Sequence, residues 1–254
     1  MKFASKVTKL LSVLLPAFCC GVSFASNPWT FEIAPYIWGV NMNGSVGVGP
    51  ARAHVDQSIG NLLKQLNFAA MLYATAHKDD FGLYFNGIYS VTSDSLSTTD
   101  FNVKEKNRFG IYGAGLSYIV FQRDFLYQRK IALEPYLGAR YTVNNTTVNV
   151  NQFSFKKDVN WTDPVVGFRL NYHFTRSWLA LLTGDIGGIN GSTHYSYSAS
   201  ALIGYQASSP SLSFLSTYLG YHILDQHYQT GNGANFYNWN MKLFGPVLGV
   251  MFTF

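Results

Sequence analysis

The stretch KIALEPYLGARYTV, residues 130–143, alternates between two kinds of side chain. Odd positions from Ile131 to Val143 are mostly apolar, whereas even positions are small, polar or charged and include Glu134 and Arg140. Because successive side chains of a β-strand point to opposite faces, this pattern predicts a strand. The second face carries too few Lys and Glu residues for contact with bulk water. The pattern therefore favours a barrel whose apolar face meets lipid and whose other face encloses a confined polar lumen.

The same alternation recurs in DPVVGFRLNYHF, residues 163–174, and in HYSYSASALIGY, residues 194–205. Turn signals separate such stretches along the whole chain, and short connections alternate with longer polar ones at 93–106, 148–161 and 225–238. This arrangement is typical of bacterial outer-membrane barrels, which have short periplasmic turns and long external loops. We predict an all-β, transmembrane antiparallel β-barrel of about ten strands, with twelve or eight as alternatives. The expected strands are approximately 29–42, 67–78, 81–92, 107–121, 131–147, 162–174, 177–189, 194–206, 211–224 and 239–254.

The composition agrees with this fold. Of the 254 residues, 12% are charged and 17% are aromatic, whereas soluble domains carry about 25% charged residues. This is an unusual composition for a cytoplasmic enzyme, and it suits a β-protein whose outer face does not meet water.

The first 25 residues have the layout of a secretory signal peptide. MKFASKVTK supplies three lysines, LLSVLLPAF supplies a short apolar stretch, and SFA at 23–25 supplies small residues for cleavage after Ala25. We therefore expect a cleaved segment at 1–25 and a barrel at 26–254. Both cysteines, Cys19 and Cys20, would be lost, so no disulfide or thiol chemistry is expected. The 18 basic and 13 acidic residues become 15 and 13, a net charge of +2, and no basic patch suggests nucleic acid.

The stretch 43–66 does not read as a simple loop. Residues 44–57 could form a hairpin, which would raise the strand number to twelve if both strands spanned the membrane. After Ser58, a possible N-cap, one apolar stripe recurs at helical spacing. The stripe consists of Ile59, Leu62, Leu63 and Leu66. So short a helix needs a surface to pack on, and the barrel lumen, where it would act as a plug, the rim and the membrane interface are all possible.

The chain ends in GPVLGVMFTF, residues 245–254. Leu248, Val250, Phe252 and Phe254 are expected on the outward face of a closing strand. The spacing of Gly249, Phe252 and Phe254 resembles the signal that the barrel-assembly machinery reads, although Val247 departs from the polar residue expected there.

The stretches WTFEIAPYIWGVNMNGSVGVGP (29–50), VDQSIGNLLKQLNFAAM (55–71), DPVVGFRLNY (163–172) and GDIGGI (184–189), together with the C-terminal stretch, resemble a broad family of uncharacterised proteobacterial outer-membrane barrels. The resemblance spans most of the mature chain. It implies the fold and an outer-membrane location. It implies no substrate and no catalytic residue.

Six charged side chains are expected to point into the lumen. They are Glu32, Glu134, Arg140, Asp163, Arg169 and Asp185. Buried charges are costly unless they are paired, so a salt-bridge network that fills the lumen is the favoured interpretation. A polar path that selects solutes is the alternative.

Enzymatic and metal sites are weaker hypotheses. His194 and Ser196 resemble the His-x-Ser pair of outer-membrane lipid A deacylases, but no glutamate follows Glu134 in the sequence. A metal site could be formed by His222, Asp225 and His227, but the favoured interpretation is that they are ordinary polar residues of a surface loop. The five tryptophans are expected at the two membrane interfaces. Trp161 and Trp239, together with Tyr228, Phe236 and Tyr237, could instead form a loop site for sugar or lipid.

We therefore expect a non-enzymatic outer-membrane barrel with a structural role or a narrow pore for small polar or amphiphilic solutes. A deacylase-like enzyme and a surface-binding protein acting through external loops are the alternatives. Expected partners are outer-membrane lipids, lipopolysaccharide and the assembly machinery. No catalytic residue, cofactor, metal or nucleic acid is expected, and the sequence does not indicate an oligomeric state.

Overall fold

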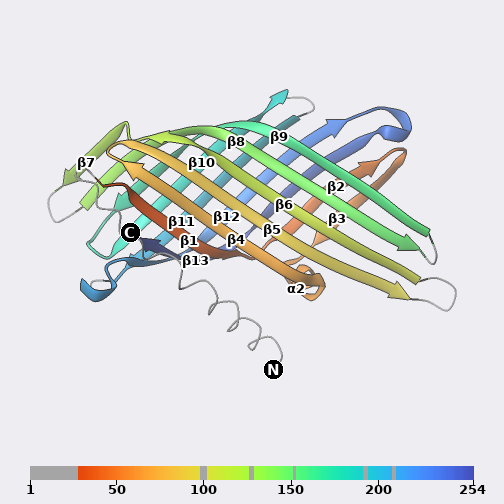
Figure 1. Ribbon diagram of the computed structural model, residues 1–254, viewed down its shortest axis with the longest axis horizontal. Helices are drawn as coiled ribbons and strands as arrows, with labels where there is room; N and C mark the ends of the chain where they lie inside the picture. The colour runs from red at the N-terminus through yellow and green to blue at the C-terminus, as the bar shows by residue number, and fades with distance from the viewer. Residues whose placement is uncertain (1–27, 98–101, 126–128, 151–152, 191–193, 208–209) are drawn as a thin grey trace.

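A computed structural model describes residues 28–97, 102–125, 129–150, 153–190, 194–207 and 210–254. The predicted signal peptide lies outside the described residues. Ten of the described strands form a closed antiparallel barrel, which confirms the predicted fold class (Figure 1). In ring order these strands are β1 (Thr30–Trp38), β4 (Leu66–Lys78), β5 (Phe81–Ser97), β6 (Asn102–Tyr118), β8 (Arg129–Val150), β9 (Phe153–His173), β10 (Trp178–Asn190), β11 (His194–Gln206), β12 (Leu215–Thr230) and β13 (Tyr237–Thr253).

The first and last strands close the ring. β1 pairs with β13 from Glu32 opposite Thr253 to Trp38 opposite Val247. Beyond this ladder, Phe31 N–H donates to Phe254 O (3.0 Å) and Phe254 N–H donates to Phe31 O (2.8 Å). We call this end of the barrel the terminal end and the opposite end the distal end. Closure matters because an unpaired backbone group in hydrocarbon costs several kcal/mol.

Three short elements between β1 and β4 adjust the height of the wall. β2 (Asn41–Val48) continues β1 along β13 in the same register, since Asn41 lies opposite Phe244 just as Trp38 lies opposite Val247. β3 (Ala51–Gln57) folds back on β2, and helix α2 (Ile59–Gln65) then leads into β4, which pairs with β1. The hairpin therefore heightens the wall without widening the ring, and the strand number stays at ten.

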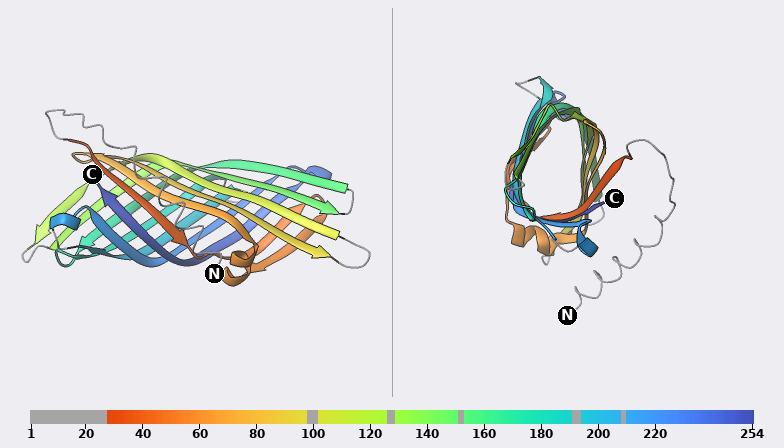
Figure 2. Two further views of the ribbon diagram at one scale, coloured as in Figure 1. Left: turned by 60° about the horizontal axis from the view of Figure 1, so that its bottom comes forward. Right: turned by 90° about the vertical axis from the view of Figure 1, so that its left-hand side faces the viewer.

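Helix α2 lies outside the ring of strands (Figure 2). Ser58 caps it, because its Oγ accepts from Asn61 N–H, as the sequence predicted. Ile59 lies close to Gly39, where an added Cβ would collide with it, and Leu63 is 53% exposed. The helix therefore does not plug the lumen, and that expectation is wrong. Of its apolar stripe, which also includes Leu62 and Leu66, Ile59 contacts the wall and Leu63 is exposed. Among the described residues, no helix is long and apolar enough to cross a membrane.

The distal wall is taller than the sequence indicated. β8 has 22 residues and β9 has 21, whereas a strand needs only about 9–11 residues to span a membrane. The expected long loops at 93–106, 148–161 and 225–238 are therefore strand for most of their length. The reason is physical: beyond the membrane the outward face of a strand meets water, as at Lys156 and Asp158 of β9, so the outward apolar residues that mark a membrane strand are missing there.

The terminal end has short connections. A two-residue turn, Asp79–Asp80, joins β4 to β5 next to the pair formed by Lys78 and Phe81. Asp79 has a φ of +53°, a conformation that Asp tolerates better than most residues. Two further short elements lie at this end: β7 (Phe121–Phe125), which pairs with β8, and the 3-10 turn η2 (Pro210–Leu212). The 3-10 turn η3 (Gly233–Asn235) joins β12 to β13 at the distal end.

The two faces of the wall differ as predicted. Outward apolar side chains are widely exposed, for example Ile186 (65%) and Leu248 (56%). Phe252 and Phe254 of the expected assembly signal also lie on this outward face, whereas Gly249 faces the lumen. Such an exposed apolar belt requires a hydrocarbon surrounding rather than water.

A charge on this belt should destabilise the barrel. Leu248→Arg places a cation in the middle of the apolar outward run 244–254, where the expected loss of unfolding free energy is about 2–4 kcal/mol. Denaturant titration of the protein refolded in lipid vesicles measures it. The matched control is Asn240→Arg, on the same face of β13 but in its polar distal part, where a change within about 0.5 kcal/mol is expected. Equal effects of the two substitutions would contradict the assignment of the belt.

Candidate functional site

A layer of charged side chains crosses the lumen near the terminal end. Glu134 of β8 is 2% exposed and lies between two partners from different strands. Arg169 Nη1 of β9 donates to Glu134 Oε2 (2.8 Å), and His77 Nε2 of β4 lies 2.9 Å from Glu134 Oε1. Nearby, Thr75 Oγ1 donates to Glu32 Oε2 (2.8 Å). This charged floor ties β1, β4, β8 and β9 together across the barrel.

Aromatic rings complete the floor. The guanidinium carbon of Arg169 lies 5.5 Å from the ring centre of Tyr73 and 5.7 Å from that of Tyr136. Contacts between a guanidinium and ring faces are attractive and are stronger where water is excluded. Arg169 is therefore held by one carboxylate and two rings.

A second ion pair lies toward the distal end. Arg140 Nη2 donates to Asp185 Oδ1 (2.6 Å), and Arg140 Nη1 donates to Ser196 Oγ (3.0 Å). Tyr136 OH donates to Asp185 Oδ2 (2.9 Å). Tyr136 can lie across the lumen because its neighbour on β9 is Gly167, where a Cβ would sit 2.6 Å from the Tyr136 ring.

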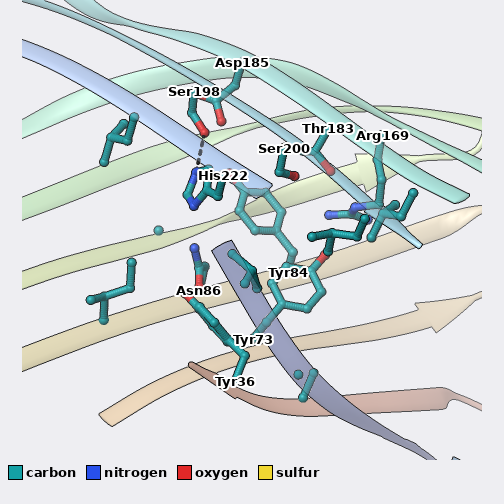
Figure 3. A pocket seen from close by; sticks show the side chains of 18 of the residues that line it. Tyr36, Tyr73, Tyr84, Asn86, Arg169, Thr183, Asp185, Ser198, Ser200 and His222 are labelled. Atoms are coloured by element: carbon teal, nitrogen blue, oxygen red, sulfur yellow. Dashed lines mark hydrogen bonds between the residues drawn. The ribbon is translucent and has the colours of Figure 1, made fainter. Parts of the chain in front are cut away.

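On the distal side of the charged floor the lumen contains a cavity of about 180 Å³, which Arg140 and Asp185 also line (Figure 3). Hydroxyl groups converge on it from all around the ring; they belong to Tyr36, Tyr73, Tyr84, Tyr136, Thr183, Ser198, Ser200 and Tyr218. Aliphatic side chains fill the gaps between them, among them Ala34, Ile88, Ile111, Val165, Leu181 and Leu202. The mixture of apolar walls with a few converging polar groups is typical of small-molecule sites.

Three polar groups of the cavity are of particular interest. Ser198 Oγ and His222 Nε2 form a hydrogen bond of 3.0 Å, seen as the dashed line in Figure 3. The hydroxyl of Tyr73 is buried without a hydrogen-bond partner among the described residues. An unpartnered buried hydroxyl costs free energy, so a bound molecule or water is expected to satisfy it.

Apolar side chains close the distal side of the cavity. Trp38 stacks on His222 with ring centres 4.4 Å apart, and Trp161 stacks on Tyr228 at 4.7 Å. We call this cluster the aromatic roof: Trp38, Ile88, Ile111, Trp161, Leu224, Tyr237, Trp239, Met241, Leu243 and Val247, with Phe109 and Tyr228 packed against it. The lumen is thus charged near the terminal end, whereas its distal part is mainly apolar and contains a few buried polar groups such as Thr142 and Gln226.

The roof overturns the expected positions of three tryptophans. Trp38, Trp161 and Trp239 are only 3%, 5% and 2% exposed and point inward, so they belong neither to an interfacial girdle nor to exposed loops. The parity of Trp161 and Trp239 within their strands could have shown this. It was hidden because the strands were predicted to end near these residues. Trp29 and Trp178 are exposed at 39% and 45% and lie at the terminal end.

The structure places all six predicted lumen charges on the inward face. It pairs Glu134 with Arg169 and Arg140 with Asp185, as described above. Glu32 instead accepts from Thr75, and Asp163, which is fully buried, contacts Nε2 of His194. The histidine partners were missed because their side chains come from strands distant in sequence.

The residues of the enzyme and metal hypotheses are also placed. Ser196 is buried and accepts from Arg140, while His194 contacts Asp163, so each has another partner. His222 faces the cavity, whereas His227 stacks on Tyr195. Within the described part of the chain, no three His, Cys, Asp or Glu side chains are grouped closely enough to bind a metal.

Comparison with known proteins supports the fold. The chain is similar to the outer membrane protease OmpT from Escherichia coli, with a TM-score of 0.57 and 8% identity over 92% of this chain and 99% of that one. It also matches Ail, the attachment invasion locus protein of Yersinia pestis (TM-score 0.38, 10% identity, 89% and 98% covered), and Neisserial surface protein A (TM-score 0.32, 14% identity, 91% and 100% covered). Neither a protein-family model nor a curated protein matches the chain. The likeness to OmpT shows an outer-membrane β-barrel fold and nothing about activity.

The charged floor should behave as one unit. Glu134→Gln leaves the Arg169 cation buried without its carboxylate, and breaking a buried pair from one side costs about 3–5 kcal/mol. Arg169→Gln should cost a similar amount. The double variant should cost much less than the sum, because the amides leave no unpaired charge. Denaturant titration in lipid vesicles measures all three.

The exposed pair formed by Lys156 and Asp158 on β9 is the control. Asp158→Asn should change stability by at most about 1 kcal/mol, since exposed ion pairs contribute little. Additive losses in the double variant, or losses no greater than that of the control, would contradict the proposed coupling.

Proposed function

We propose that this protein is an integral outer-membrane barrel that binds a small molecule in the middle of its lumen and lets such molecules pass narrowly. The observation that carries the proposal is the cavity between the charged floor and the aromatic roof. Its polar side chains come from strands all around the ring and converge on one space. In this proposal the terminal end faces the periplasm, as the short turns of bacterial barrels do.

A wide pore is not what the geometry favours. The floor fills the lumen with Glu134, Arg169 and His77 in direct contact. The roof contains Leu224, Met241 and Leu243, each at most 2% exposed. A molecule that crosses the barrel must displace side chains, so passage would be slow and selective.

The size of the cavity limits the ligand. An engineered apolar cavity of about 150 Å³ binds benzene, so a cavity of about 180 Å³ suits a molecule of one ring. Tyrosine and aliphatic walls favour an apolar face on this ring, and the surrounding hydroxyls favour hydroxyl substituents.

The charges of the cavity limit the ligand further. Arg140 is paired with Asp185 and Arg169 with Glu134, so the two cations already have carboxylate partners. An anionic ligand would have to compete with these pairs and would introduce an uncompensated charge. We therefore propose an uncharged, hydroxyl-bearing ring, either free or as the head of an amphiphile.

A cavity-filling substitution tests this proposal. A Cβ added at Gly113, which lines the cavity, has no heavy atom closer than 3.9 Å, so Gly113→Leu can project into the cavity without a backbone clash. Titration calorimetry of the detergent-purified protein with resorcinol and with inositol should show binding of at least one. Gly113→Leu should weaken it at least tenfold.

The matched control is Ala114→Leu, which places the same side chain on the exposed outer face at the neighbouring position. This variant should bind like the unmodified protein. Benzoate, a charged ring of similar size, should bind at least tenfold more weakly than the better neutral ring. Equal binding by the Gly113 variant, or no binding of either neutral ring, would contradict the proposed site.

A further inference from the structure

The wall of the barrel has a seam on its distal side. β3 pairs with β2, and the distal part of β5, residues 93–97, pairs with β6. Among the described residues, no backbone ladder joins β3 to this part of β5, although both belong to the same wall. The seam begins at the distal end of β4. This end is Leu66, the first residue of the strand, which lies opposite Thr92 of β5.

Helix α2 crosses the base of the seam. At its first turn, Ile59 N–H donates to Asn41 Oδ1 of β2 (2.9 Å). At its last turn, Gln65 Nε2 donates to Asp94 Oδ2 of β5 (2.9 Å). The helix thus bridges the two sides of the seam through side-chain hydrogen bonds instead of a β-ladder. Such polar links are individually weak.

Polar groups without partners flank the inner side of the seam. Gln57 is the last residue of β3, and its Oε1 is buried without a partner. On the other side, Asn107 pairs with Thr92 in the ladder between β5 and β6, and its Oδ1 is also buried. Neither oxygen has a hydrogen-bond partner among the described residues. Unpartnered buried acceptors are costly, so they indicate that water or a ligand donates to them.

Packed apolar side chains lie between the seam and the cavity. Val55 of β3 and Met42 of β2 pack against the aromatic roof. Ile88 and Ile111 belong to the same roof and also line the cavity. Helix α2, which lies outside the wall (Figure 2), carries Leu63, which is 53% exposed.

We propose that this seam is a lateral route by which the chain of a single-chain amphiphile passes between the membrane and the lumen, with α2 as its latch. The inference rests on the proposed function, and it narrows the ligand to an amphiphile with a small, uncharged ring as its head. The ring occupies the cavity, while the chain lies along the roof toward the seam. A free strand edge is costly in hydrocarbon, which places the seam at the level of the membrane surface, where an amphipathic helix also prefers to lie.

A reversible lock across the seam tests the route. The expected mature chain has no cysteine, so Gln65→Cys and Asp94→Cys can be joined by a short bis-methanethiosulfonate cross-linker and released by a reductant. Trp29→Phe and Trp178→Phe in the same protein leave the three roof tryptophans, all at most 5% exposed. The probe is dodecyl glucoside brominated near the end of its chain, added to protein in lipid vesicles. Bromine quenches tryptophan fluorescence only at short range.

The probe should quench the roof tryptophans, the lock should slow this quenching at least tenfold, and the reductant should restore the rate. The control lock joins Lys156→Cys and Asp158→Cys on the outside of β9, where it should have no effect. Quenching that is equally fast with either lock, or no quenching without a lock, overturns the route. Calorimetry with the soluble rings is independent of the seam, so failure of the route and failure of the cavity site can be told apart.

Discussion

The structure depends on one constraint: every backbone N–H and C=O in the hydrocarbon layer must be hydrogen-bonded within the protein. The ladder between β1 and β13 meets it by closing the ring, down to the reciprocal hydrogen bonds of Phe31 and Phe254. Closure fixes the alternation of side chains, because each strand must then show one face to lipid and one to the lumen. The exposed apolar belt and the buried charges are two consequences of this geometry.

The lumen of a ten-stranded ring is narrow, so its side chains must either pair or pack. Near the terminal end they pair, through Glu134, Arg169, Arg140 and Asp185. Near the distal end they pack, through the aromatic roof. The cavity lies between these two regions, and the hydroxyl of Tyr73 is buried there without a partner among the described residues. Ligand binding at that level would therefore use groups that the fold leaves unsatisfied.

Much of the fold could be predicted from the sequence, because alternation is a local property of each strand. The inward position of Glu134 and Arg140 follows from the same parity that marks Leu137 as outward. The height of the distal wall could not be predicted, since its outward face meets water and no longer carries the apolar residues that mark a membrane strand. The pairing of Asp163 with His194 and of Ser198 with His222 joins residues far apart in the chain. Strand parity gives their face, and only the register between strands gives their contacts.

The central claim is that alternate residues of each strand face lipid and a lumen closed to bulk water. Single cysteines at successive positions 131–143 of β8, spin-labelled in vesicles, test it directly by relaxation with oxygen and with a water-soluble nickel chelate. The account predicts a period of two, with high oxygen accessibility at odd positions and little contact with the chelate at even ones. Uniform accessibility along the strand, or free contact of the chelate with even positions, would contradict it.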